Sequence, residues 1–247
     1  FGVMSVDANN RVTQFEEKPA NPQPVPGTDD LFLASMGIYV FSMDLLLTVL
    51  EDDHQHENSS HDFGIDIIPT LIQQTRVHAY RFGGEAGRVS PDRYWRDVGT
   101  LDSFYEANMD LLKPVPSLDL YQPDWPIRTY MAQYPPARTV PGVSGSEGIF
   151  INSMVAGGVV IIGGSVQHSI LFPNVTIGEE AVIHDAILFN GVKVGQGAEL
   201  DRCIIDKDVK IPPGERIGVD RERDAARFTI SDKGVVVVPK GYRFMQD

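Results

Sequence analysis

The carboxy-terminal part of the chain repeats one pattern of aliphatic side chains every 17 residues. Between residues 160 and 217 the intervals are 6, 5, 6, 6, 5, 6, 6, 5, 6 and 6. A helix repeats its buried face about every 3.6 residues and a strand every two, so neither explains the pattern. A coil with flat sides, each side burying one aliphatic residue toward a common axis, does explain it. The series consists of Val160, Val166, Leu171, Ile177, Ile183, Leu188, Val194, Leu200, Ile205, Ile211 and Ile217.

This periodicity predicts a parallel β-helix of the hexapeptide type with about three coils. Small residues stand two positions before many members of the series, as at Ala181, Ala186 and Cys203. The thiol of Cys203 is most simply interpreted as a small core group. Residues 227–241, "RFTISDKGVVVVPKG", favour a hairpin that covers the open end of the coil. We assign residues 148–247 to this domain.

Residues 1–112 alternate segments typical of strands and helices, which indicates α/β organisation. Strand-like runs at 1–7 and 11–17 flank a turn and predict a hairpin. The apolar run 32–41 predicts a buried strand, and 77–82 a further one. Helices are expected after Ser42, from Asp66 and after Thr100, each at a side chain suited to a helix start. The fold class is therefore α/β plus β.

Residues 113–147 have a different texture from the segments on either side. Seven of the chain's 17 prolines lie between 113 and 142, so regular structure is not expected there. The positions are 114, 116, 123, 126, 135, 136 and 141. Several tyrosines make the segment too apolar for a free linker, and we predict a packed connection between two domains.

The overall composition excludes several classes of function. A net charge of −13 argues against nucleic acid as a partner, because a polyanion requires a basic surface. No apolar run approaches the roughly 18 residues that suggest a membrane span. The single cysteine allows no internal disulfide and fits a reducing compartment, so we expect a cytoplasmic protein.

The stretch "YWRDVGT", residues 94–100, places Trp95, Arg96 and Asp97 before a helix start. A surface salt bridge between Arg96 and Asp97 is the simplest interpretation of that pair. The glycine-containing turn at a helix start also favours anionic ligands. A carboxylate beside a phosphate site is suited to hold Mg²⁺, which prefers hard oxygen ligands.

Two further places carry candidate binding residues. In "EEKP", Lys18 offers a point charge to a phosphate and Glu17 an acceptor for sugar hydroxyls. Taken alone, the tetrapeptide is a weak signal, and a solvated strand end is its simpler explanation. Ser35 lies within an apolar run and faces either a ligand or a core partner. The histidine-rich segment 51–62 matches no metal-ligand spacing and is interpreted as a solvated loop. Neither a G-x-G-x-x-G loop nor a P-loop occurs.

As a set, these segments closely resemble bacterial glucose-1-phosphate adenylyltransferase, the ADP-glucose pyrophosphorylase family. The resemblance rests on "FGVMSVD", "FEEKPANP", "LASMGIYVF", "HDFGIDIIP", "YWRDVGTLDSFYEANMDLL" and the 17-residue repeat, in this order. It implies part of a Rossmann-like nucleotidyltransferase domain followed by a left-handed β-helix. The implied reaction converts ATP and α-D-glucose 1-phosphate into ADP-glucose and pyrophosphate, the first step of glycogen synthesis.

The resemblance also implies roles for particular residues. Asp97 corresponds to a metal-binding aspartate and, with Lys18, is expected to be catalytic. Glucose 1-phosphate is expected to contact Gly2, Glu17, Lys18, Ser35, Tyr39, Asp62, Phe63 and Trp95. Lys207 and Lys240 stand where related enzymes commonly have arginine at an allosteric site, and lysine keeps the charge without the bidentate geometry. The family implies a homotetramer with a sugar-bisphosphate activator and a nucleotide inhibitor.

The family's ATP loop, with its activating lysine and arginine and its other metal aspartate, is expected to precede residue 1. A complete nucleotidyltransferase domain needs roughly 100–200 further residues, so we expect a fragment that is inactive alone. Two alternatives stay open: a non-catalytic regulatory subunit of the same family, and a hexapeptide acyltransferase. The latter requires a catalytic histidine on a protruding loop, for which His168 and His184 are candidates.

Overall fold

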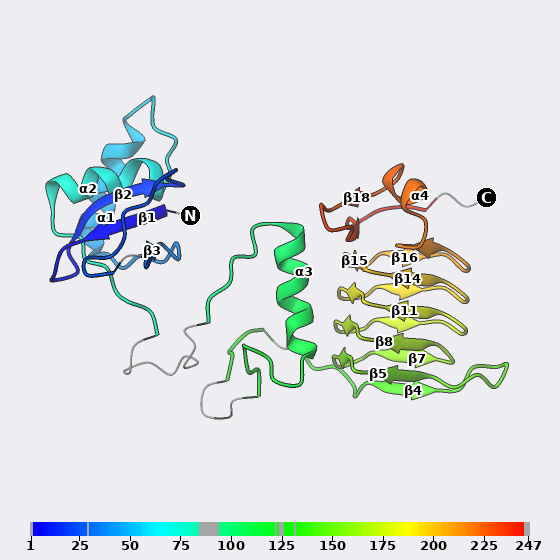
Figure 1. Cartoon of the computed structure of the whole chain (residues 1–247). Coiled ribbons are helices and arrows are strands. Elements are labelled where there is room, and N and C mark those ends of the chain that lie inside the picture. Colours follow the sequence, from blue (N-terminus) through cyan, green and yellow to red (C-terminus); the bar gives the residue numbers. More distant parts are fainter. Residues whose placement is uncertain are drawn as a thin grey trace. The chain divides into compact units, whose positions relative to one another are not determined.

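The computed structural model describes residues 2–28, 30–83, 94–121, 123, 126–130 and 132–244 (Figure 1). The chain divides into two compact units, Phe1–Gly87 and Arg88–Asp247, and each is described by itself. No helix in the described part of the chain combines the length and the apolar character needed to cross a membrane.

A small antiparallel sheet and two packed helices form the first unit. Strands β1 (Gly2–Val6) and β2 (Val12–Glu17) make the expected hairpin, and β3 (Leu33–Ala34) pairs with the other edge of β1. Helix α1 spans Met43–His54, and a π-helical turn at Phe63–Ile67 leads into α2 (Ile68–Gln74). The core of this unit is Val6, Val12, Phe15, Ile67, Ile68 and Leu71.

The first unit differs from the sequence-based expectations in three places. The apolar run 32–41 forms only the two-residue strand β3, and Val40 is 97% exposed. The segment 77–82 contributes a single bridge between His78 and Arg11 in place of a strand. The helix expected from Asp66 begins earlier, because the Asp62 side chain accepts the first free backbone N–H groups.

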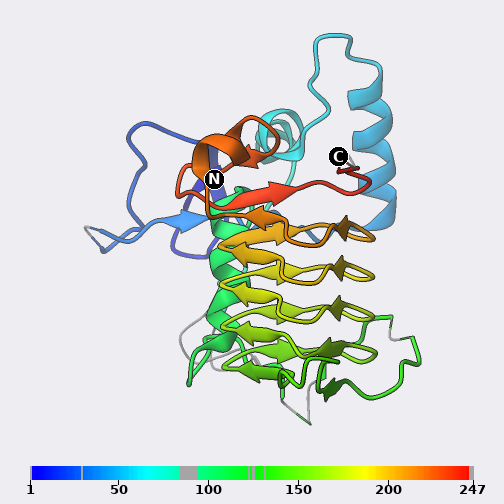
Figure 2. The ribbon, with the colours of Figure 1, turned by 90° about the vertical axis from the view of Figure 1, so that its right-hand side faces the viewer.

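The β-helix of the second unit has three faces, and each face is a sheet in which strands of successive coils pair in parallel (Figure 2). The first face contains β4 (Arg138–Val140), β7 (Val160–Ile162), β10 (Thr176–Ile177), β13 (Lys193–Val194) and β16 (Lys210–Ile211). The second contains β5 (Ile149–Ile151), β8 (Ser165–Gln167), β11 (Val182–His184), β14 (Glu199–Asp201) and β17 (Arg216–Ile217). The third contains β6 (Met154–Val155), β9 (Ile170–Leu171), β12 (Ile187–Leu188), β15 (Cys203–Ile205), β19 (Val236–Val238) and β18 (Thr229–Ile230).

The interior of the coil is the aliphatic series that the sequence predicts, with one correction. Ten of the eleven members are buried, but Val160 is only half-buried and its neighbour Ile161 points inward. The strand register shows why, since Ile161 pairs with Ile177 and that coil is one residue shorter than the later ones. Cys203 lies in the same interior, and burial raises the pKa of its thiol.

The β-helix is longer than the predicted three coils. Two faces are five strands deep, and the first strand begins at Arg138, ten residues before the expected boundary at 148. The sequence does not indicate the first coil, because its strand β5 is half-exposed throughout and does not continue the buried aliphatic pattern. At the other end, β18 and β19 form the expected antiparallel closing hairpin, and helix α4 (Arg221–Ala225) precedes it.

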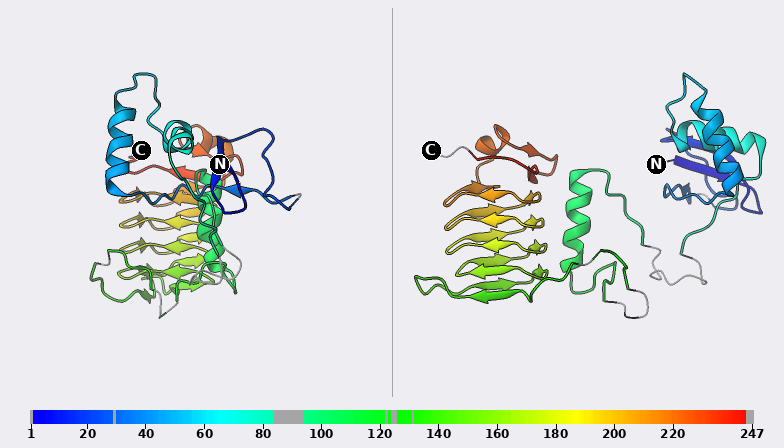
Figure 3. Two further views of the ribbon diagram at one scale, coloured as in Figure 1. Left: turned by 90° about the vertical axis from the view of Figure 1, so that its left-hand side faces the viewer. Right: turned by 180° about the vertical axis from the view of Figure 1, so that it is seen from behind.

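Helix α3 (Leu101–Met109), continued by a 3₁₀ turn at Asp110–Leu112, lies alongside the stacked coils (Figure 3). Thr100 caps its start with a capping box that uses Ser103. Tyr105 and Met109 pack against the outer side chains Ile170, Ile187 and Ile204 of the third face. The Tyr105 hydroxyl donates to the Asp185 carbonyl at 2.7 Å, and burial raises the pKa of Tyr105. Although α3 falls within the predicted domain 1–112, it belongs to the compact unit of the β-helix.

Candidate active site

The β1–β2 hairpin places the Glu17 carboxylate between two glycines. Gly2 and Glu17 are register partners, and a Cβ on Gly2 would lie 2.3 Å from Phe15 Cζ and 3.0 Å from Glu17 Oε2. A Cβ on Gly64 would lie 3.2 Å from the same oxygen. Both positions therefore favour glycine, because a larger residue would meet the phenyl ring or the carboxylate. The backbone of both glycines is buried and packs closely against the Phe15 ring and the Glu17 carboxylate.

Ser35 joins this group from the end of β3. Its backbone N–H donates to the Gly2 carbonyl at 2.8 Å, which fixes the segment against β1. Its hydroxyl lies 3.2 Å from the Tyr39 hydroxyl and accepts the Gly37 N–H at 3.1 Å. These contacts present two hydroxyl groups side by side, each able to donate or accept a hydrogen bond.

An aromatic wall follows. The rings of Tyr39 and Phe63 are stacked with centroids 5.6 Å apart, and Phe41 packs against both. Phe63 is held at the start of the π-helical turn, where Asp62 Oδ1 accepts the N–H groups of Gly64 at 2.7 Å and Ile65 at 2.9 Å. Asp62 therefore shapes the backbone, and the wall offers apolar faces of the kind on which sugar rings pack.

Lys18 follows Glu17 with a backbone conformation that is unusual for its residue type. Its φ of +50° lies in the left-handed region, which asparagine, aspartate and histidine visit more readily than lysine. The side chain is exposed, and it forms no ion pair with any residue that the structure describes. Strained backbone is found preferentially at functional sites, where the direction of a side chain matters.

The second unit carries Trp95 and Asp97 ahead of α3. Arg96 does not pair with Asp97; it donates to Glu106 at 2.8 Å and to Asp110 at 2.5 Å, which fastens the segment to α3. Asp97 is exposed and forms no ion pair within the described ranges. The salt-bridge interpretation of the Arg96–Asp97 pair is therefore wrong, and the Asp97 carboxylate is available for another partner.

The two lysines expected at an allosteric site lie next to each other on the β-helix. Asp206 follows β15 and accepts the Lys207 N–H at 2.7 Å through Oδ1 and the Lys240 N–H at 3.2 Å through Oδ2. The register of β15 and β19 pairs Ile205 with Val238, so the segments that follow these two strands leave the sheet side by side. Both lysine side chains are exposed, and their backbone N–H groups meet at the Asp206 carboxylate.

Of the predicted residues, the first unit brings together Gly2, Glu17, Ser35, Tyr39, Asp62 and Phe63, with Lys18 adjoining Glu17; the second unit carries Trp95, Asp97, Lys207 and Lys240. Sequence reasoning missed Phe15 and Gly64, which pack against Glu17. Regular strand alternation gave no signal for Phe15, because the buried Val12 and Phe15 are three residues apart and the β1–β2 register shifts between them.

Histidines of the histidine-rich segment and the two candidate histidines of an acyltransferase have aspartate partners. His61 pairs with Asp53 at 2.7 Å beside the end of α1, which extends into the predicted loop. His168 and His184 each bond an aspartate of the next coil at regular corners of the β-helix.

Comparisons with known proteins agree with this architecture. Residues 1–114 match the family model described as nucleotidyl transferase, and residues 135–238 match the one described as GlmU-like, C-terminal hexapeptide. The class is therefore a nucleotidyl transferase region followed by a hexapeptide β-helix.

Individual relatives narrow the class to one family. The chain is 59% identical over 244 residues to glucose-1-phosphate adenylyltransferase 2 of Vibrio parahaemolyticus and 58% identical to that of Vibrio cholerae. It is 51% identical over 248 residues to glucose-1-phosphate adenylyltransferase of Thermus thermophilus. Each comparison covers 99% of this chain and 60% of the relative. The chain thus belongs to the glucose-1-phosphate adenylyltransferase family and spans about 60% of the length of these relatives.

Proposed function

We propose that the protein containing this chain makes ADP-glucose and pyrophosphate from ATP and α-D-glucose 1-phosphate, the first step of glycogen synthesis. The observation that carries the proposal is the convergence of Glu17, Ser35, Tyr39 and Phe63 beside Gly2. Carboxylate and hydroxyl groups next to an aromatic wall are suited to bind a sugar, because they accept and donate hydrogen bonds while the rings cover its apolar face.

In this proposal the first unit binds and orients glucose 1-phosphate. Glu17 accepts hydrogen bonds from sugar hydroxyls, and Lys18 contacts the phosphate as a point charge. The phosphate oxygen of the sugar then attacks the α-phosphorus of ATP in line with the pyrophosphate leaving group. Such reactions depend mainly on positioning and on neutralising the charge that builds up on the phosphate oxygens.

Mg²⁺ is the cofactor that this chemistry requires, and Asp97 is the residue we propose to hold it. A single exposed carboxylate without an ion-pair partner in the described part of the chain fits Mg²⁺, which typically binds one or two carboxylates together with substrate phosphates. When bound, the ion supplies positive charge to the phosphate oxygens. Trp95, two residues earlier, is proposed to contact the sugar.

Regulation and assembly follow from the same proposal. Lys207 and Lys240, arranged by Asp206, are proposed to bind the phosphates of a sugar-bisphosphate activator, and a nucleotide acts as inhibitor. We propose a homotetramer located in the cytoplasm, a compartment in which the free thiol of Cys203 stays reduced.

The test is pyrophosphate release by the full-length protein. We expect release only when ATP, glucose 1-phosphate and Mg²⁺ are all present, with ADP-glucose as the second product in equal amount. A panel of other nucleoside triphosphates and sugar phosphates then defines specificity. Release that does not depend on glucose 1-phosphate, or a nucleotide sugar other than ADP-glucose as the main product, would overturn the proposal.

A further inference from the structure

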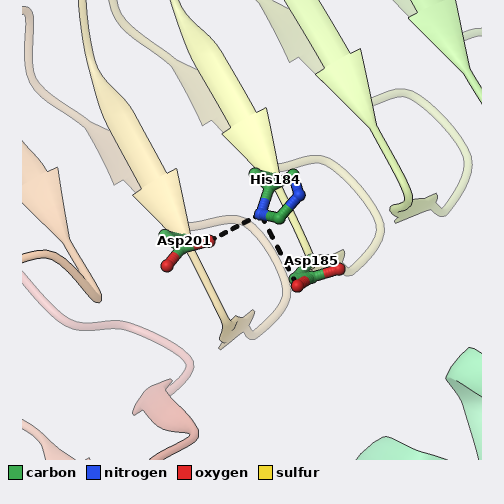
Figure 4. Close-up of side chains that lie close together, drawn as sticks. All are labelled: His184, Asp185 and Asp201. Atoms are coloured by element: carbon green, nitrogen blue, oxygen red, sulfur yellow. Dashed lines mark hydrogen bonds and ion pairs between the residues drawn. The ribbon is translucent and has the colours of Figure 1, made fainter.

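Four potential metal ligands gather at one corner of the β-helix. His184 ends β11, Asp201 ends the neighbouring β14, and Asp185 follows His184 at the turn (Figure 4). His168 occupies the position equivalent to Asp185 in the preceding coil. Among the residues that the structure describes, His184, Asp185 and Asp201 are the only group of three such side chains that converge closely enough for one ion.

The distances within the group suit a small divalent cation. His184 Nδ1 lies 2.8 Å from Asp201 Oδ1 and 3.5 Å from Asp185 Oδ2, and the three ligand atoms all lie within 4.8 Å of one another. Ligand atoms about 2.1 Å from a tetrahedral zinc ion are roughly 3.4 Å apart. The His184–Asp201 pair, at 2.8 Å, would therefore open by about 0.6 Å, and the most distant atoms, within 4.8 Å, would approach by at most about 1.4 Å to admit the ion. Figure 4 shows the three side chains directed toward one another.

The backbone holds these ligands in place without the ion. His184 and Asp201 are register partners on adjacent parallel strands, so their separation is set by the sheet. Asp185 takes a left-handed conformation, with a φ of +47°, at the corner of the coil. A site built on rigid strands loses little conformational freedom on binding, which favours affinity.

His168 supports the group from outside. Its Nδ1 is bonded to Asp185 Oδ1, which leaves Oδ2 directed toward His184. Partners of this kind orient a ligating carboxylate and typically change metal affinity by about 10- to 100-fold when removed. His168 is accordingly a positioning residue in this arrangement.

We propose that His184, Asp185 and Asp201 form a binding site for a borderline divalent cation of the Zn²⁺ and Co²⁺ class. One imidazole nitrogen and two carboxylate oxygens are the donor types that these ions accept, and water completes the coordination. All three side chains are partly exposed, which gives the ion a path from solvent. The ion binds His184 Nδ1 in place of the Asp201 hydrogen bond, in the tautomer of the neutral ring that carries its one proton on Nε2.

A cation bound at this corner of the β-helix affects the contact between α3 and the β-helix. The Asp185 carbonyl accepts the Tyr105 hydroxyl, and Arg202 lies over the Tyr105 ring at 5.5 Å from its centroid. An ion held by the Asp185 side chain restrains the same residue that receives this hydrogen bond. The site is thus a structural one, which couples adjacent coils and stabilises the folded state by mass action.

The test is zinc binding by the full-length protein, measured by equilibrium dialysis with metal analysis and by the melting temperature with and without Zn²⁺. Asp201→Asn and His184→Gln keep the size and hydrogen-bonding capacity of the side chains but weaken the ligand set. We expect about one ion per chain, lost or weakened at least tenfold in both variants, and weakened about 10- to 100-fold in His168→Ala. Zn²⁺ should raise the melting temperature of the wild type but not of Asp201→Asn.

His56→Gln is the matched control, because His56 lies in the histidine-rich segment and its ring bonds the Asp52 carbonyl of helix α1. Unchanged zinc binding in that variant would place the ion at the β-helix corner. Equal binding by wild type and Asp201→Asn, or loss of binding in His56→Gln alone, would overturn the proposal, as would the absence of bound zinc. In that case the corner is a ladder of histidine–aspartate hydrogen bonds only.

Discussion

At the scale of single residues, Arg96 and Asp97 have separate roles although they are neighbours. Arg96 is bonded to Glu106 on α3 and to Asp110 in the 3₁₀ turn that follows it, and this holds the segment in which Asp97 lies. The sequence places Trp95, Arg96 and Asp97 before a helix but does not show that Arg96 and Asp97 have different partners. The partners of Arg96 lie 10 and 14 residues further along the chain. Their spacing of four residues on one helix face was the signal available.

Replacing Asp97 by asparagine tests its proposed role as a metal ligand. The amide keeps the size of the side chain but lacks the negative charge, so we expect kcat of the full-length protein to fall at least about a hundredfold at fixed Mg²⁺. The matched control is Asp232→Asn, a change at an exposed position in the closing hairpin. Turnover retained by Asp97→Asn would refute the metal assignment.

The ion pair of Glu106 on α3 with Lys233 in the closing hairpin makes the stability of the protein depend on pH. The hydrogen bond from Lys233, at 2.5 Å, lowers the pKa of Glu106, and the charges of Lys233 and Arg96 act in the same direction. A lowered pKa in the folded state means that the contribution to stability is present above the unfolded pKa of about 4.5 and is lost as pH falls through the folded value.

We therefore expect Glu106→Gln to be less stable than the wild type at pH 7, and the difference to disappear as pH falls below about 4.5 and through the lowered folded-state pKa of Glu106. Urea unfolding at several pH values measures the difference, which added salt should reduce because the pair is exposed. Glu57→Gln, at an exposed position in the first unit, serves as the control. A difference that persists unchanged at low pH would contradict the ion-pair account.

At the scale of elements, strand β11 shows how the coil is stabilised. Ile183 is fully buried in the interior, whereas its neighbour Val182 points outward and is 49% exposed. Ile183→Ala should cost about 2–5 kcal/mol in free energy of unfolding, because it leaves a cavity in a packed interior. Val182→Ala should cost under about 0.5–1 kcal/mol. Denaturant unfolding of the two variants makes the comparison, and equal losses would contradict the assigned inward face.

Some elements could be predicted from the sequence and others could not. The hairpin of β1 and β2 and the capped start of α3 rest on local signals, namely alternation with a turn and a threonine before a helix. The run 32–41 looked like a buried strand because apolar residues were continuous there, yet hydrophobicity alone does not specify a pairing partner. The left-handed backbone of Lys18 had no sequence signal, since lysine is not a residue that favours it.

At the scale of the whole molecule, the β-helix was the most predictable part. Each coil must bury the same positions as the coil below it, so the 17-residue repeat states one constraint many times. The length of the stack was underestimated where the first coil departs from that repeat. The residues proposed to bind the sugar phosphate were inferred from resemblance, whereas the Ser35–Tyr39 contact and the packing of Glu17 beside Gly2 and Gly64 required the structure.

The central claim is that the first unit binds the sugar phosphate, and Lys18→Ala in the full-length protein tests it most directly. Loss of a charged contact to phosphate is worth about 1.5–3 kcal/mol, so the KM for glucose 1-phosphate should rise roughly 10- to 100-fold, with the KM for ATP changed far less. Glu16→Ala, at an exposed position on β2 two residues before Lys18, should change neither value. Equal increases in both KM values, or none in that for glucose 1-phosphate, would contradict the claim.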